Sequence, residues 1–186
     1  MKLTDEELAL KVQDGDKEAF GEVIDRFEKP LCAFIYRMLG DKDNCADALQ
    51  ETFLKAYKNI NSFDPKRKFS SWIYRIAHNE AITHYRKNAK HVVLDDVAEI
   101  ASENNNAETI QKNLDLEGQK RLLDKALLSI TLKYREVIVF RFYEDKSYEE
   151  ISEIMHLPVN TVGTYLNRGK QEIKKHFKNI NLEEIL

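Results

Sequence analysis

Hydrophobic residues recur every three or four positions along most of the chain, which is the spacing of amphipathic helices rather than of strands. Near the start, Thr4 is followed three residues later by Glu7, a pairing typical of a capping box. The pattern therefore predicts a short first helix that begins after Thr4 and ends near Gly15.

A second apolar series at helical spacing runs from Phe20 to Met38 and predicts a long helix that ends at Gly40. Pro30 lies inside this series and cannot donate a backbone hydrogen bond. We therefore expect the helix to be kinked or divided near Glu28.

A third helix is expected where apolar and polar positions separate onto two faces. The apolar positions are Ala46, Leu49, Phe53, Leu54 and Tyr57. The polar positions opposite them are Asp47, Gln50, Glu51 and Lys55. The spacing predicts that the apolar set is packed inside and that the polar set faces solvent.

A fourth helix is expected from Ser70, which can act as its N-cap, to Ala89. The four helices together form a first module, residues 1–91. The next segment, residues 92–118, holds seven acidic residues and one basic residue, with three consecutive Asn and no sustained period. This composition predicts an acidic flexible linker.

Helical patterning resumes at Leu122 and continues to Phe140, with Thr131 as a cap between two helices. A second capping box, Ser147 with Glu150, then opens a short helix that ends at residues 156–158. The last helix is expected over residues 159–177. Residues 119–186 form the second module.

The last two helices and their three-residue turn match the helix-turn-helix plan, in which the second helix enters the DNA major groove. Its first turn is expected to meet base edges, and its later turns to meet phosphates. The candidates are Asn160, Thr161 and Thr164 for bases, and Arg168 and Lys170 for phosphates.

The predicted fold class is therefore all-α: two small helical domains joined by a flexible linker, the C-terminal one containing a helix-turn-helix. With only six Gly and three Pro, the chain does not have the composition of a β-sandwich or a Gly-rich nucleotide fold. No uninterrupted apolar run comes near the length that spans a bilayer, and residues 1–7 lack the apolar core of a signal peptide. We therefore expect a cytoplasmic protein.

Only two cysteines occur, Cys32 and Cys45. A reducing compartment would keep them as thiols, so no disulfide framework is expected, and the apolar surroundings of Cys32 in the sequence predict that it is buried.

Charge is segregated along the chain although the net charge is only −3. Residues 64–91 hold seven basic and two acidic side chains, and residues 159–178 hold five and one. Basic stretches attract phosphate backbones, whereas the overall acidity argues against a protein that coats nucleic acid indiscriminately.

Nearly the whole chain resembles the extracytoplasmic-function (ECF) sigma factors, sigma-70-type subunits that direct bacterial RNA polymerase to promoters. Residues 47–57, DALQETFLKAY, resemble the family's helix for docking on the polymerase clamp coiled coil. The resemblance implies that core polymerase is contacted by Asp47, Leu49, Gln50, Glu51, Phe53 and Leu54. The alternative for this segment alone is an ordinary solvated helix face.

Residues 69–79, FSSWIYRIAHN, with YRK at 85–87, are similar to the family's minus-ten recognition and melting region. The loop at 61–68 would form a pocket for a flipped base, and Tyr74 could offer another aromatic face. The implied DNA contacts are Lys66, Arg67, Lys68, Trp72, Arg75, Asn79 and Arg86. For Trp72 a role in the core is the competing interpretation.

Residues 147–175 resemble the family's minus-thirty-five helix-turn-helix. The family commonly has a Lys and an Arg where this chain has Gly163 and Tyr165. Tyr165 is therefore either a DNA contact, beside Asn160, Thr161, Thr164, Arg168 and Lys170, or a part of the core.

The resemblance implies core RNA polymerase (clamp coiled coil and flap), promoter DNA and an anti-sigma factor as partners. It implies no cofactor, no metal, no catalytic residue and no insertion of this chain into a membrane, even where an anti-sigma partner is membrane-bound. Three other classes were weighed: a stand-alone helix-turn-helix regulator, a small helical enzyme and a protein adaptor. The regulator leaves residues 47–57 and 69–87 without a role, and the enzyme lacks a Gly-rich phosphate loop, a metal-ligand spacing and a nucleophile motif.

Overall fold

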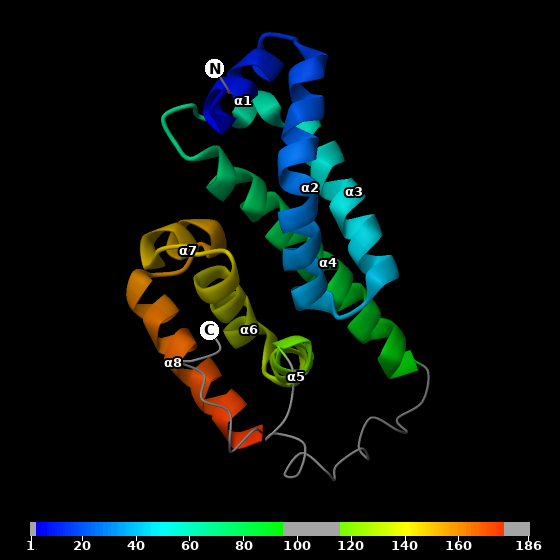
Figure 1. The fold of residues 1–186 in the computed structure, drawn as a ribbon, viewed down its shortest axis with the longest axis vertical. Helices are drawn as coiled ribbons and strands as arrows, with labels where there is room; N and C mark the ends of the chain where they lie inside the picture. The colour runs from blue at the N-terminus through cyan, green and yellow to red at the C-terminus, as the bar shows by residue number, and fades with distance from the viewer. Residues whose placement is uncertain (1–2, 95–115, 177–186) are drawn as a thin grey trace.

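The computed structural model describes residues 3–94 and 116–176, and these residues form helices joined by turns, with no strand among them. The first group contains α1 (Asp5–Gln13), α2 (Lys17–Leu39), α3 (Lys42–Lys58), the 3-10 turn η1 (Ile60–Ser62) and α4 (Phe69–Leu94). The second contains α5 (Leu116–Ser129), α6 (Leu132–Ile138), the π-helical turn η2 (Val139–Tyr143), α7 (Tyr148–Met155) and α8 (Val159–His176). The predicted all-α class is confirmed (Figure 1).

Local sequence signals account for several helix ends. Both predicted capping boxes are present: the Thr4 amide donates to Glu7, and the Ser147 amide donates to Glu150, each at 2.8 Å. Gly40 has a φ of 73°, which favours glycine, and a Cβ there would lie 2.8 Å from Leu128 Cδ1 of α5. Gly40 therefore both ends α2 and allows α5 to pack closely against that end.

One of the two alternatives for α2 is excluded, and the expected start of α4 is wrong. Helix α2 is not divided near Glu28 but continues through Pro30 to Leu39. Helix α4 begins at Phe69 rather than after Ser70, because the Phe69 amide donates to Glu6 Oε1 of α1 at 2.9 Å. A carboxylate from a distant helix thus takes the capping role that a local serine was expected to fill.

Helix α4 also continues to Leu94, past the expected end at Ala89, and α5 begins at Leu116. Helix therefore occupies both ends of the segment expected to be a linker. The middle of that segment, residues 95–115, lies outside the described residues, as do residues 177–186.

The buried face of α3 differs from the predicted one. The side chains packed inside are Cys45, Ala48, Thr52 and Ala56. Small side chains at these positions bring α3 close to α2 and α4, and the larger apolar residues are turned outward. Ala46 is exposed, Leu49 and Phe53 are half-buried, and Leu54 and Tyr57 are 44% and 40% exposed.

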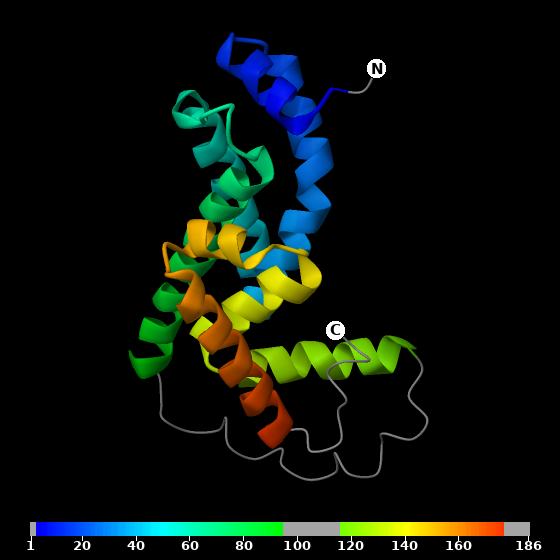
Figure 2. The ribbon, with the colours of Figure 1, turned by 90° about the vertical axis from the view of Figure 1, so that its left-hand side faces the viewer.

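The two helical groups share one hydrophobic core. Phe34 of α2, Tyr74 of α4 and Phe140 of η2 form its centre, with the Phe34 and Phe140 ring centroids 4.7 Å apart. The buried Arg135 of α6 donates to the carbonyl oxygen of Met38 at 2.6 Å. Figures 1 and 2 show the second group beside α4 and the C-terminal half of α2, away from α1.

The helix-turn-helix is formed as predicted. Helix α7 ends at Met155, His156 has a left-handed φ of 53°, and α8 begins at Val159. Gly169 lets α8 pack closely on α6, because a Cβ at that position would lie 2.6 Å from Ile138 Cδ1.

Candidate nucleic-acid and partner interfaces

The outer face of α3 is an open surface with a polar row and an apolar groove, which we call the α3 face. Asp47, Gln50 and Glu51 are exposed on it. The groove beside them is lined by Lys17, Phe20, Ile24, Gln50, Phe53, Leu54 and Tyr57. The ring centroids of Phe20 and Tyr57 lie 5.0 Å apart, so α2 and α3 build the groove jointly.

The α2 residues of this groove were not among the predicted contacts. Phe20 and Ile24 are four residues apart and therefore lie on one face of α2. The helical spacing was visible in the sequence, but the pairing of this face with α3 depends on tertiary packing.

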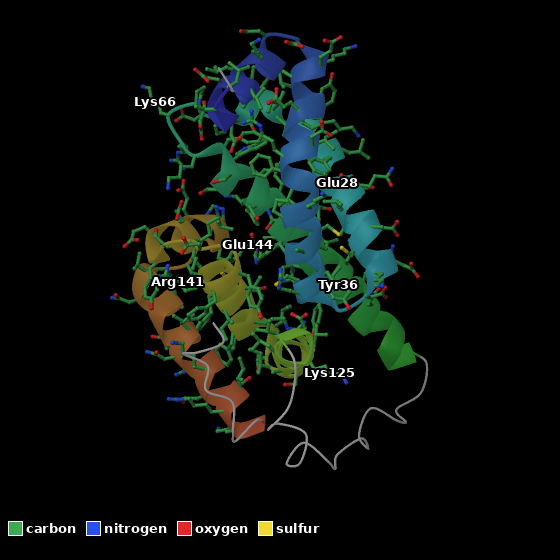
Figure 3. The ribbon with its side chains drawn as sticks, in the orientation of Figure 1. Glu28, Tyr36, Lys66, Lys125, Arg141 and Glu144 are labelled. Atoms are coloured by element: carbon green, nitrogen blue, oxygen red, sulfur yellow. The ribbon has the colours of Figure 1, made fainter. Side chains whose placement is uncertain are left out.

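The loop before α4 presents its three basic residues to solvent. Lys66, Arg67 and Lys68 are all exposed, and Figure 3 shows Lys66 pointing away from the molecule. Asp64 stabilises the loop, because its carboxylate accepts a hydrogen bond from the Lys66 amide at 3.0 Å.

A polar pocket lies beneath this loop. Its lining is Ser62, Phe63, Asp64, Arg67, Lys68, Ser71, Trp72, Arg75 and Glu153. Trp72 is half-buried and packs against Phe63 and Phe69, with centroid distances of 5.6 and 5.5 Å. Trp72 therefore packs against the core and also lines the pocket, and its predicted contact with DNA stays a prediction.

Six of the seven predicted minus-ten residues fall into two clusters, and Lys66 belongs to neither. Arg67, Lys68, Trp72 and Arg75 surround the pocket. Asn79 and Arg86, further along α4, line a second hollow together with residues of α6, α7 and α8.

Tyr74 is not available as an aromatic face. It is 5% exposed and packs on Phe34 and Phe140, and its hydroxyl donates to the Glu144 carboxylate. Burial and the neighbouring Glu144 raise the pKa of Tyr74 above its ordinary value. The expectation fails because Tyr74 lies on the side of α4 that faces the second helical group, where it contacts Phe140 and Glu144.

Acidic residues of α7 contact the basic side chains around the pocket. Arg67 Nη1 lies 2.5 Å from Glu153 Oε1, and Arg75 Nη2 lies 3.6 Å from the same oxygen. Lys68 Nζ lies 2.9 Å from Glu150 Oε1. Carboxylates therefore occupy the positions next to these cations that phosphates would need.

The pKa of Glu150 reflects this pairing. Partial burial alone would raise it, but the hydrogen bonds from Lys68 and from the Ser147 amide outweigh burial and hold the pKa of Glu150 below its ordinary value. The same pair raises the pKa of Lys68.

Helix α8 carries an exposed row at i, i+4 and i+8. Asn160, Thr164 and Arg168 are exposed, and Thr161 is half-buried beside them. Tyr165 packs against Tyr134 of α6 with a centroid distance of 5.5 Å. Lys170 lies outside the row, with its ammonium 4.9 Å from the centre of the Phe142 ring.

Comparison with known proteins identifies the family of the chain. Residues 23–91 match the family Sigma-70 region 2, and residues 120–173 match Sigma-70, region 4. The chain is 35% identical over 180 residues to the ECF RNA polymerase sigma factor SigW of Bacillus subtilis, which covers 91% of this chain and 95% of the relative. The chain belongs to the ECF sigma factors. It is an alternative sigma factor, and sigma factors are transcription initiation factors rather than enzymes.

Further relatives extend this match. The sigma factor is 30% identical over 182 residues to the ECF RNA polymerase sigma-E factor of Escherichia coli K12, with 92% of this chain and 93% of the relative covered. Two solved structures share its fold. One is CnrH in complex with the cytosolic domain of CnrY (TM-score 0.70, 23% identity, 94% of this chain and 97% of that one). The other is RpoE with the anti-sigma factor NepR from Bartonella quintana (TM-score 0.67, 24% identity, 86% and 97%).

Within residues 3–94 and 116–176 of the sigma factor, no group of three or more His, Cys, Asp or Glu side chains is placed to hold a metal ion. In that same part of the chain, no helix is long and apolar enough to cross a membrane.

Proposed function

We propose that three surfaces of the protein each have a separate binding role in promoter recognition. The α3 face docks on the clamp coiled coil of core RNA polymerase, the loop before α4 and α4 itself open the minus-ten element, and α8 binds the minus-thirty-five element. Residues 1–91 and 119–186 are then the two functional domains. The observation that best supports this assignment is the match to sigma-70 regions 2 and 4 on these same two parts of the chain.

The chemistry of the α3 face suits a protein partner. Its apolar groove lies beside the exposed Asp47, Gln50 and Glu51, which is the arrangement of an apolar centre with a polar rim. The two carboxylates favour a basic partner and speed its approach. Leu49, Phe53 and Leu54 belong to the same contact.

The pocket beneath the loop suits one unstacked base. Trp72 offers an aromatic ring, and Arg67, Lys68 and Arg75 offer cations for the flanking phosphates. Lys66 extends the basic loop, and Asn79 and Arg86 continue the DNA path along α4. Capture of a base outside the stack favours strand opening.

On α8, Asn160, Thr161 and Thr164 are the base readers, and Arg168 is a phosphate contact. We assign Lys170 to the DNA backbone as well, which requires its side chain to leave the Phe142 ring. Tyr165 contributes to the packing of α8 on α6 and reaches DNA with its exposed part.

We further propose that an anti-sigma factor binds this chain, which is supported by the crystallised complexes of proteins that share its fold. The polymerase flap would hold the second domain. The protein would act in the cytoplasm, and RNA synthesis would be carried out by the core enzyme without a cofactor bound to this chain.

Run-off transcription tests the proposal directly. Bacterial core RNA polymerase is incubated with a promoter library, with and without the purified protein, and transcript starts are sequenced. We expect discrete starts only when the protein is present, with two shared upstream elements. DNA binding by the folded protein without any starts would instead support a stand-alone helix-turn-helix regulator.

A further inference from the structure

The two cysteines of the chain lie against each other between α2 and α3. Cys32 Sγ is 3.6 Å from Cys45 Sγ, and Cys45 Sγ is 3.3 Å from the carbonyl oxygen of Cys32. By its spacing, Cys32 lies one helical turn after Glu28 and one before Tyr36 on α2, and Figure 3 labels these two neighbours. Because the chain has no third cysteine, only one intramolecular disulfide is possible.

The two thiols differ in access. Cys32 is exposed, which corrects the expectation that it is buried, whereas Cys45 is only 3% exposed. Burial, with the neighbouring Cys32 as a second cause, raises the pKa of Cys45 to about 12. An oxidant in solvent therefore reaches Cys32 first, and Cys45 lies beside it as a protonated thiol.

We propose that Cys32 and Cys45 form a site of reversible oxidation by hydroperoxides, with Cys32 as the attacked thiol and Cys45 as the resolving thiol. The S–S bond length of about 2.05 Å requires the sulfurs to close by roughly 1.5 Å. Rotation of the two side chains and a small shift of α3 against α2 can supply that movement.

The chemistry proceeds in two balanced steps. Cys32 loses its proton to solvent and its thiolate attacks hydrogen peroxide; the O–O bond breaks, Cys32 becomes a sulfenic acid, and the leaving hydroxide takes up a proton to become water. The Cys45 sulfur then attacks the Cys32 sulfur, an S–S bond forms and the S–O bond breaks. The Cys45 proton leaves with the hydroxyl as a second water. A dithiol reductant reverses the reaction and is itself converted to a disulfide.

The crosslink would lie behind the α3 face, because Cys45 is on the buried side of α3, only about 3 Å along the helix axis from the exposed Asp47. Pulling the start of α3 toward α2 tilts the polar row relative to the groove. We infer that the oxidised chain binds core polymerase several-fold more weakly than the reduced chain. This half of the inference rests on the proposed function, whereas the formation of the disulfide does not.

Intact-mass spectrometry of the reduced full-length chain after treatment with hydrogen peroxide tests the disulfide. The wild type is expected to lose two hydrogens in mass and both free thiols, and a dithiol should restore them. Cys45→Ser should stop at a sulfenic acid that dimedone captures, and Cys32→Ser should keep its thiol. Cys45→Ala is the second variant if the serine disturbs folding, as judged from its thermal melt.

The proposal is overturned if the wild type accumulates sulfinic acid or intermolecular dimers instead, or if its thiols survive as long as the thiol of Cys32→Ser. Polymerase affinity is then compared between oxidised wild type and peroxide-treated Cys32→Ser. Equal affinities would overturn the effect on docking while leaving the disulfide intact. Loss of binding by both reduced proteins would contradict the proposed docking role.

Discussion

The first helical group carries two of the proposed binding surfaces, and they differ in their exposure to solvent. The α3 face is open, with Asp47, Gln50 and Glu51 in solvent. The promoter surface around the pocket is covered, because α7 places Glu150 and Glu153 against its basic side chains. If the surfaces act as proposed, polymerase can dock on this arrangement, whereas promoter DNA reaches the pocket only after α7 moves away.

Two kinds of interaction join the helical groups at the covered surface, ion pairs and a buried apolar contact. Ion pairs such as Arg67 with Glu153 are largely exposed and contribute little to stability. The apolar contact of Phe140 with Phe34 and Tyr74 is buried and holds the two groups together. On the proposed assignment, these carboxylates would compete with DNA phosphates, so the ion pairs would control access to the pocket rather than stability.

The largest effect is expected from removing this apolar contact. Phe140→Ala deletes a fully buried ring and should lower the free energy of unfolding by about 3–5 kcal/mol, as measured by urea denaturation. Phe142→Ala, at a half-buried position in the same turn, is the control and should have a smaller effect. A loss no greater for Phe140→Ala than for Phe142→Ala would contradict the role of this contact.

On the open surface, Glu51→Lys should weaken binding to core polymerase about tenfold without a change in the thermal melt, because it reverses a charge of the polar rim. Binding is measured by surface plasmon resonance. The matched control is Lys58→Glu, an exposed charge reversal near the end of the same helix. Unchanged affinity of Glu51→Lys would remove the α3 face from the docking site.

On the covered surface, Glu153→Lys should strengthen binding of the free chain to a single-stranded minus-ten oligonucleotide by roughly threefold to tenfold, because it breaks contacts with two arginines. Glu149→Lys adds the same charge at an exposed position of α7 and should have a weaker effect. Equal gains for both variants would mean that charge alone, rather than uncovering, is responsible.

The smallest expected change concerns α8. Arg168→Ala should weaken binding to duplex minus-thirty-five DNA about equally across sequences and reduce the salt slope by about one unit. Fluorescence anisotropy at several salt concentrations measures both. A sequence-selective loss would show instead that Arg168 reads a base.

Structural features that depend on residues within one helical turn of each other could be predicted from the sequence. The pairs Thr4 with Glu7 and Ser147 with Glu150 set helix starts through contacts three residues apart, and both are present in the structure. The family resemblance also placed Arg67, Lys68, Trp72 and Arg75 in one functional set, and the structure gathers them around one pocket.

Features that depend on packing between distant segments were not predictable. The buried face of α3 was misassigned because the large apolar residues were expected inside, whereas close helix packing selects the small Ala48 and Ala56. The contact of Arg67 with Glu153 joins positions 86 residues apart, and no local spacing indicates it.

If the three surfaces act as proposed, α7 must leave the pocket when the protein is bound to core polymerase, because Glu150 and Glu153 otherwise hold its basic side chains. Fluorescence energy transfer between labels carried by unnatural amino acids at Asn61 and Glu149, both exposed, follows the separation of the two helical groups. The account predicts high transfer in the free protein and a clear fall when core polymerase is added. Transfer that is already low in the free protein, or that stays high in the complex, would contradict it.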